Sequence, residues 1–121
     1  MAEHNDTGSN GEVLAVNYLK QKGYTILETN WRFKNLEADI IASTNNTLVV
    51  AEVKTRSSNY LGEPELFVNK LKQKNLIKAA NEYVQRNNID FEVRFDIISI
   101  LIKNTIPTIN HIEDAFYANG K

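Results

Sequence analysis

Four charged side chains on two short hydrophobic segments of the sequence have the residue types and spacing of a cation-binding site. They are Glu37, Asp39, Glu52 and Lys54. Because side chains alternate along a β-strand, the first two share one strand face, and the last two also share one face. Carboxylate oxygens are the ligands that hard cations such as Mg²⁺ prefer, so Asp39 and Glu52 could share one ion.

The segments that carry these charges are predicted to pair as a hairpin. Residues 36–42 and 48–55 are typical of strands, and a cluster of Ser, Thr and Asn residues separates them. A turn centred on the two asparagines of this cluster places Asp39 directly opposite Glu52, and Glu37 opposite Lys54. Directly opposed residues have Cβ atoms about 4.5–5.5 Å apart, which lets two carboxylates reach one divalent cation.

Two opposed carboxylates repel each other, which leaves two interpretations of this hairpin. On a solvated outer face the repulsion costs little, and the charges need have no function. In a covered sheet the same pair is more typical of a site. The residues expected beside the charges are Ile41, Leu48 and Val50. Those expected on the opposite face are Ala38, Ile40, Val49, Ala51 and Val53. Both faces are therefore predicted to be covered, which favours the site.

The elements that must position these charges follow from the hydrophobic pattern. We expect, in order, a helix, three antiparallel strands, a helix and a strand, at 10–21, 24–33, 36–42, 48–55, 65–86 and 91–102. A short edge strand is expected at 108–112. A long helix between two strands implies a right-handed crossover and parallel pairing. The prediction is an α/β fold whose mixed sheet lies between helices.

Composition restricts the classes of protein to be considered. The 121 residues fit one domain, 1–121, and 42% hydrophobic residues are typical of a globular chain. Cysteine is absent, and His4 and His111 are far apart, so we expect no zinc site and interpret His111 as a loop or edge residue. No segment has the apolar length of a signal peptide or a membrane span, which predicts a cytoplasmic protein without a membrane partner.

Short groups of residues distributed over nearly the whole chain match, in order, a pattern found in a known family. The groups are Gly11-Glu12, Ala15, Tyr18-Leu19, Gly23-Tyr24, Asn30, Glu37-Ala38-Asp39, Glu52-Val53-Lys54-Thr55-Arg56, Gly62, Lys72-Gln73, Ala79-Ala80, Arg94-Phe95-Asp96 and Ala115-Phe116. This succession resembles the YraN-type family of small bacterial proteins, although Leu36 stands where that family usually has glycine. Its acids and lysine also resemble the PD-(D/E)xK nuclease superfamily, which includes Holliday junction resolvases.

The resemblance implies a three-layer α/β/α, restriction-endonuclease-like fold and an endonuclease that hydrolyses DNA, including branched, recombination or repair intermediates. Asp39 and Glu52 would bind Mg²⁺ or Mn²⁺ together with the Val53 carbonyl. Lys54 would orient the attacking water and neutralise charge in the transition state. Glu12, on the first helix, would bind or orient a water of that ion.

Cations outnumber acids by seven to three between residues 54 and 88, although the whole chain has a net charge of −1. Arg56, Lys70, Lys72 and Lys74 could therefore contact DNA phosphates, and the resemblance places Gln73 near the site. The alternative for the lysines is a solvated helix surface. The resemblance also implies a homodimer. The rival functions are a nucleic-acid-binding module without cleavage and an interaction protein without nucleic acid.

Overall fold

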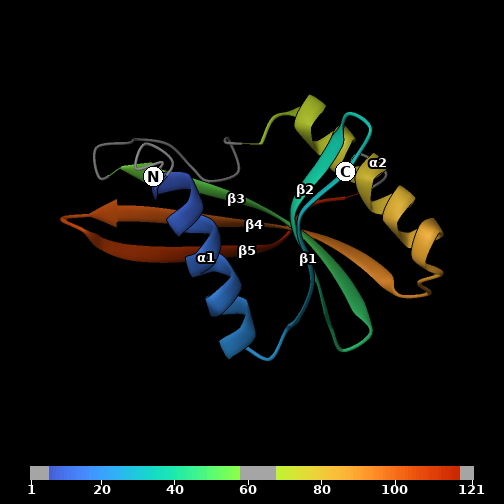
Figure 1. The fold of residues 1–121 in the computed structure, drawn as a ribbon, viewed down its shortest axis with the longest axis horizontal. Coiled ribbons are helices and arrows are strands. Elements are labelled where there is room, and N and C mark those ends of the chain that lie inside the picture. The colour runs from blue at the N-terminus through green and yellow to red at the C-terminus, as the bar shows by residue number, and fades with distance from the viewer. Residues whose placement is uncertain (1–5, 58–67, 118–121) are drawn as a thin grey trace.

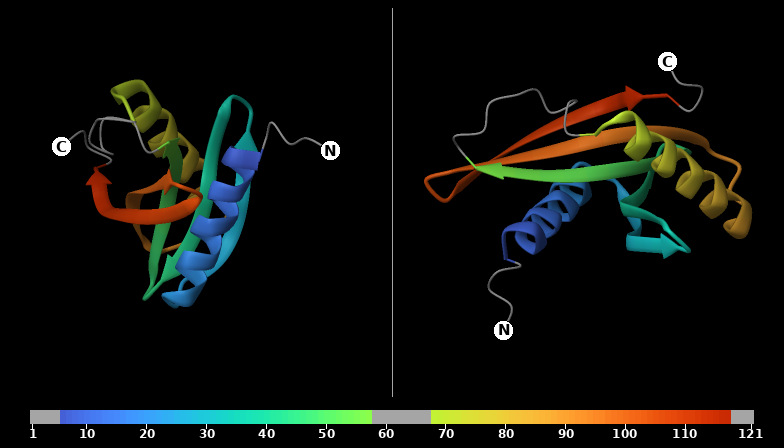
Figure 2. Two further views of the ribbon diagram at one scale, coloured as in Figure 1. Left: turned by 90° about the vertical axis from the view of Figure 1, so that its left-hand side faces the viewer. Right: turned by 90° about the horizontal axis from the view of Figure 1, so that it is seen from above.

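A computed structural model of the protein describes residues 6–57 and 68–117 and contains a five-stranded sheet between two helices. The elements are α1 (Asp6–Gln21), β1 (Thr25–Phe33), β2 (Leu36–Thr44), β3 (Thr47–Ser57), α2 (Lys70–Asn87), β4 (Glu92–Lys103) and β5 (Ile106–Phe116). The strand order is β1-β2-β3-β4-β5; β3 and β4 are parallel, and the other neighbours are antiparallel. The two helices lie on opposite faces of the sheet (Figures 1 and 2). This confirms the predicted mixed sheet and three-layer α/β/α arrangement.

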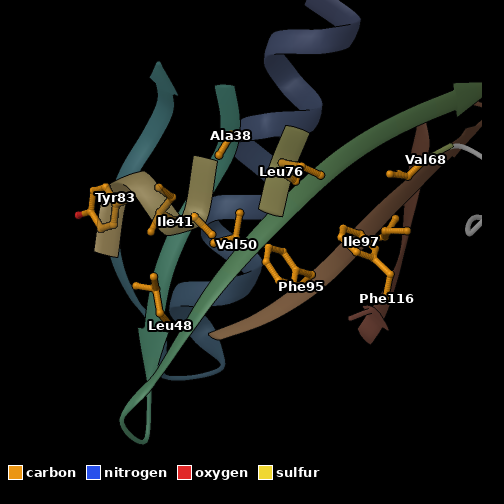
Figure 3. Packing of buried hydrophobic residues seen from close by; sticks show 11 residues of the cluster. Ala38, Ile41, Leu48, Val50, Val68, Leu76, Tyr83, Phe95, Ile97 and Phe116 are labelled. Atoms are coloured by element: carbon orange, nitrogen blue, oxygen red, sulfur yellow. The ribbon is translucent and has the colours of Figure 1, made fainter. Parts of the chain in front are cut away.

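Each face of the sheet carries its own hydrophobic cluster. The α1-side cluster contains Ala15, Leu19, Tyr24, Ile40, Ala42, Val49, Ala51, Ile98 and Ile100. The α2-side cluster, shown in Figure 3, contains Ala38, Ile41, Leu48, Val50, Val68, Leu76, Ala80, Tyr83, Phe95, Ile97 and Phe116. Strands β3 and β4 contribute to both clusters, which explains why their sequences are apolar at successive positions.

Asparagines set the boundaries of α2. The Asn69 side chain accepts a hydrogen bond from the Lys72 backbone N–H at 2.9 Å, and Asn88 ends the helix with φ 52°. The helix therefore begins at Lys70, later than the predicted residue 65, because Asn69 caps it in an extended conformation. Residues 65–67 of the predicted helix, and Gly62, lie outside the described residues.

The β2–β3 hairpin turns where the sequence predicted. Asn45 and Asn46 have φ angles of 49° and 61°, the left-handed conformation that asparagine tolerates and that a tight hairpin turn needs. The strands pair from Thr44–Thr47 to Ile40–Ala51, in the predicted register. The ladder ends there, so the predicted pair of Asp39 and Glu52, the next along, is not part of it. Beyond that point the two strands separate in direction (Figure 1).

Strand β5 is longer than the predicted segment 108–112, because it pairs with β4 from Lys103–Ile106 to Phe95–Phe116. Its outward residues are polar, so its sequence lacks the apolar run that identifies β4. Over the described part of the chain, neither helix combines the length and apolar character needed to cross a bilayer.

Candidate functional site

Asp39 lies at the point where the paired ladder between β2 and β3 ends. It follows the last pair, Ile40–Ala51, toward the start of β2. Its Oδ2 accepts a hydrogen bond from the Val53 backbone N–H at 2.9 Å. The Asp39 side chain therefore takes a donor of β3 that the regular ladder no longer reaches, and it is held between the diverging strands.

Glu52 places a second carboxylate beside Asp39, and two lysines converge on it. Its side chain is 4% exposed, and its Oε2 lies 3.4 Å from the Lys54 amine and 3.1 Å from the Lys72 amine. Lys54 lies two residues along β3, whereas Lys72 comes from the first turns of α2. The predicted convergence of Asp39, Glu52 and Lys54 is present, and Lys72 joins it.

The surroundings of Asp39 disfavour the charged form of its carboxyl group. Burial, followed by repulsion from Glu52, raises the pKa of Asp39 from 3.8 to about 6. The Val53 N–H and the positive charge of Lys72 act in the opposite direction but do not cancel the rise. Asp39 and Glu52 are thus close enough to repel each other strongly, even with lysines beside them.

Lys72 responds to the same charges. Its partial burial works to lower the pKa of the amine, but attraction to Glu52 and then Asp39 outweighs burial, so the pKa lies above its ordinary value. The amine is therefore held as a cation. Lys72 also lines a cleft of about 180 Å³ with Asn35, Glu37, Asn75 and Leu76.

Glu37 does not pair with Lys54 as the register predicted. Its Oε1 lies 3.5 Å from the Arg32 guanidinium, and both side chains are largely exposed. Ala38 also differs from expectation, because it belongs to the α2-side cluster rather than to the face of Ile40. The side-chain alternation shifts at Asp39, where the ladder with β3 has ended.

Helix α1 approaches β3 directly behind Lys54. A Cβ added to Gly11 would collide with the Thr55 Oγ1, so only glycine allows this approach. The next residue, Glu12, accepts a 2.7 Å hydrogen bond at Oε1 from the Asn30 side chain of β1. The register of β1 and β2 aligns Asn30 with Asp39, because Thr29 pairs with Ile40. Among the described residues, Glu12 does not join Asp39 and Glu52 in a group of three acids, so the structure places it beside β1 and not within the acidic pair.

The other predicted DNA-contacting residues lie on β3 and α2, the elements that carry Lys54 and Lys72. Arg56 follows Lys54 on the same strand face, and its Nη1 donates to the Thr55 carbonyl at 3.0 Å. Lys70 and Lys74 are exposed in the first turns of α2. Gln73 is turned to its own helix end, where its Nε2 donates to the Val68 carbonyl at 3.1 Å.

The donor set fits one hard divalent cation. Over residues 6–57 and 68–117, no three His, Cys, Asp or Glu side chains gather into a group that could hold a metal ion. Mg²⁺, however, commonly uses one or two carboxylates and completes its coordination with water and substrate phosphates. Asp39 and Glu52 supply the carboxylates. The Val53 carbonyl points to the same side as its N–H, which Asp39 accepts, so it faces the pair.

A second buried acid, Asp96, forms a separate network on β4. Arg94 donates to both Asp96 oxygens at 3.0 and 2.9 Å, and His111 Nε2 lies 2.7 Å from Asp96 Oδ2. The other ring nitrogen of His111 lies 3.1 Å from the Tyr18 hydroxyl. Arg94 and Asp96 lie two residues apart on β4, so their side chains share one strand face. The role of His111 was missed, because no local pattern indicates that an edge-strand histidine is buried.

Comparison with other proteins places the chain in a family. The family described as "Uncharacterised protein family UPF0102" matches residues 11–100. The UPF0102 protein FP2501 of Flavobacterium psychrophilum is 55% identical over 117 residues, which cover 97% of this chain and 98% of the relative. UPF0102 proteins of Christiangramia forsetii and Parabacteroides distasonis are 51% and 48% identical, and each match covers 98% of the relative.

Among solved structures, one titled "Crystal structure of SSO0001" covers 98% of this chain and 56% of that chain, with 15% identity and a TM-score of 0.38. That similarity is too low to bear on function. The match to residues 11–100 includes Glu12, Asp39, Glu52 and Lys54, and the curated relatives align over nearly their full length. The chain therefore belongs to the UPF0102 family, which the sequence resemblance described as YraN-type.

Proposed function

We propose that this protein is a Mg²⁺-dependent nuclease that hydrolyses phosphodiester bonds in DNA. The observation that carries the proposal is the convergence of Asp39, Glu52 and Lys54 where β2 and β3 separate. The elevated pKa of Asp39 supports the proposal, because acids whose pKa is shifted by burial and by a specific charged neighbour are common at functional sites.

Each residue of the site has a distinct part in the proposed reaction. Asp39, Glu52 and the Val53 carbonyl would hold the cation, which supplies Lewis acidity and lowers the pKa of water. Lys54 is one-quarter exposed and lies 3.4 Å from Glu52, so its amine can neutralise charge that grows on the phosphoryl oxygens. Glu12, held by Asn30, would orient the attacking water.

Substrate binding is assigned to the cations around this group. Arg56, Lys70 and Lys74 lie on the strand and helix that carry Lys54 and Lys72. Each phosphate that such a cation neutralises releases condensed counterions, so affinity should fall with salt concentration. Contacts of this kind position a nucleic acid without reading its sequence.

The test is a panel of labelled duplex, single-stranded and four-way-junction DNA, with RNA alongside, incubated with Mg²⁺, Mn²⁺ or EDTA. We expect cleavage of DNA that requires the metal. Lys54→Ala should lower the rate at least about 100-fold, whereas Lys20→Ala, which removes an exposed lysine in the last turn of α1, should cleave normally. Unfolding curves of both variants serve as the check that the fold is intact.

Two results would contradict the proposal. If every substrate stays intact while salt-sensitive binding persists, the protein is a nucleic-acid-binding module. A specific observation favours that second candidate, because Lys54 and Lys72 already balance the charges of Asp39 and Glu52. If Lys54→Ala cleaves as fast as the unaltered protein, Lys54 has no part in catalysis.

A further inference from the structure

Lys72 has a place in the site that differs from that of every other predicted DNA-contacting cation. Its amine lies 3.1 Å from Glu52 Oε2, a shorter distance than the 3.4 Å of Lys54. Lys54 is tied to the site by its position on β3, whereas Lys72 reaches Glu52 across the sheet surface from α2. Glu52 is thus contacted by the Lys54 amine from its own strand and by the Lys72 amine from helix α2.

The position of Lys72 in α2 is electrostatically unfavourable for the helix. The first turn of α2 contains no acid, and Lys72 is the third helical residue after the Asn69 cap. A cation near a helix N-terminus interacts unfavourably with the helix dipole. Attraction to Glu52 and Asp39 offsets this cost, so the lysine serves the acidic pair and not the helix.

Space beside Lys72 allows its amine to move. The side chain is 38% exposed, compared with 23% for Lys54, and it lines the cleft that also contains Asn35 and Asn75. Glu37 also lines the cleft, so Lys72 is the cation there that could meet the phosphate of a bound strand in the proposed function. The amine can therefore exchange one anionic partner for another without a change in the backbone.

Charge balance shows when that exchange is favourable. Two carboxylates and two amines are close to neutral together, so Glu52 is satisfied without a metal. A divalent cation at the same carboxylates adds two positive charges to a partly buried group and repels both amines. An anion can neutralise the resulting excess of positive charge, and the phosphodiester group of the substrate is such an anion.

From this geometry we infer, on the basis of the proposed function, that Lys72 is a displaceable internal cation. It holds Glu52 while no divalent ion is bound, and it transfers to a substrate phosphate oxygen when such an ion takes its place. Divalent cation and phosphodiester therefore bind cooperatively, and each raises the affinity for the other by the same factor. Lys72 is a positioning residue that couples the two ligands.

The test measures Mn²⁺ binding by calorimetry at pH 7.5, without DNA and with a short phosphorothioate duplex that resists cleavage. Lys72→Met, which keeps the length of the side chain, should bind Mn²⁺ about tenfold more tightly than the unaltered protein when DNA is absent. The duplex should strengthen Mn²⁺ binding to the unaltered protein about tenfold and have much less effect on Lys72→Met.

Two further variants separate exchange from other effects. Lys78→Met removes an exposed charge later in the same helix and should leave Mn²⁺ affinity unchanged, both without and with the duplex. Lys72→Arg keeps the charge and should bind Mn²⁺ as weakly as the unaltered protein. If Lys72→Met and the unaltered protein bind Mn²⁺ equally, the exchange is wrong while the proposed nuclease stands. If no form binds Mn²⁺ with or without DNA, the proposed metal site itself is wrong.

Discussion

Within residues 6–57 and 68–117 the protein has two acidic centres with buried carboxylates, and their charges are compensated in opposite ways. Asp96 is fully buried and accepts hydrogen bonds from Arg94 and from the Asp114 backbone N–H, with His111 at 2.7 Å. Burial acts to raise the pKa of Asp96, but His111 and Arg94 outweigh it, and the pKa lies below the ordinary value. Asp39 has the Val53 N–H and a neighbouring acid, and its pKa rises to about 6.

This difference separates a structural acid from a site that can bind a ligand. At Asp96 the chain itself provides the compensating donors, so ionisation stabilises the fold. At Asp39 and Glu52 the chain leaves charge repulsion that an external cation can relieve. Both centres have an arginine or lysine beside a carboxylate, so the residue types alone do not distinguish them.

The largest expected effect on stability is at Asp96. Asp96→Asn keeps the shape of the side chain but leaves Arg94 and His111 without their anion. Removing one member of a buried pair costs about 3–5 kcal/mol, and we expect about 3 kcal/mol because Arg94 keeps Tyr24 and Glu113 as partners. Urea unfolding at neutral pH measures it. A loss below about 1 kcal/mol would contradict the structural role of this network.

Asp39→Asn should have its main effect on activity instead. The amide oxygen can still accept from the Val53 N–H, so the fold is retained, but one negative ligand is lost. We expect DNA cleavage to fall at least about 100-fold. Cleavage assays with the most rapidly cut DNA of the panel measure the effect. Normal cleavage by Asp39→Asn would remove Asp39 from the ligand set.

The two centres should give opposite dependences of stability on pH. Because the folded pKa of Asp39 is raised from 3.8 to about 6, its contribution to stability is fully present below pH 4 and is lost as pH rises toward 6. Asp39→Asn should therefore gain roughly 1–3 kcal/mol over the unaltered protein between pH 4 and pH 7, in EDTA. If the unfolding free energies of the two proteins change with pH in parallel, the pKa of Asp39 is not raised in the folded state.

Asp96 should make stability depend on pH in the opposite direction. Its pKa is lowered in the folded state, so its contribution is present at neutral pH and is lost as pH falls through and below 3.8. The difference in stability between the unaltered protein and Asp96→Asn should therefore shrink on acidification. A difference that grows as pH falls would show that the ionised carboxylate does not stabilise the fold.

Tyr18→Phe tests the outer edge of the Asp96 network and should have the smallest effect. It removes the 3.1 Å contact between the Tyr18 hydroxyl and His111 while keeping the ring that packs edge-on against the imidazole. We expect a loss of about 0.5–1.5 kcal/mol in unfolding free energy. DNA cleavage should not change, and a large loss of activity would show that the two centres are coupled.

Most of the architecture was predictable because local patterns determine it. The two left-handed asparagines of the β2–β3 turn set the hairpin register, and the register carries Asp39 and Glu52 toward the same place. What the register could not predict is that the ladder ends at Ile40–Ala51 and that the Asp39 side chain replaces the next backbone contact.

Long-range placement explains the parts of the site that sequence reasoning assigned differently. Lys72 was predicted as a phosphate contact, but its partner Glu52 is determined by how α2 packs on the sheet, which helical periodicity does not reveal. His111 was interpreted as an edge or loop residue. It does lie on the edge strand, and only the packing of α1 against that strand brings Tyr18 to it and buries it.

The close approach of Gly11 to Thr55 leaves no space for even a methyl group between α1 and β3. Glu12 and Lys54 are the immediate neighbours of these two residues, so one contact sets the spacing between helix and strand where both begin to meet the site. A larger residue at position 11 would force either the Thr55 side chain or the start of α1 to shift, and a shift of the helix would move Glu12 relative to Lys54. The activity of variants with larger residues at position 11 would therefore show how strongly the proposed reaction depends on the distance between Glu12 on α1 and Lys54 on β3.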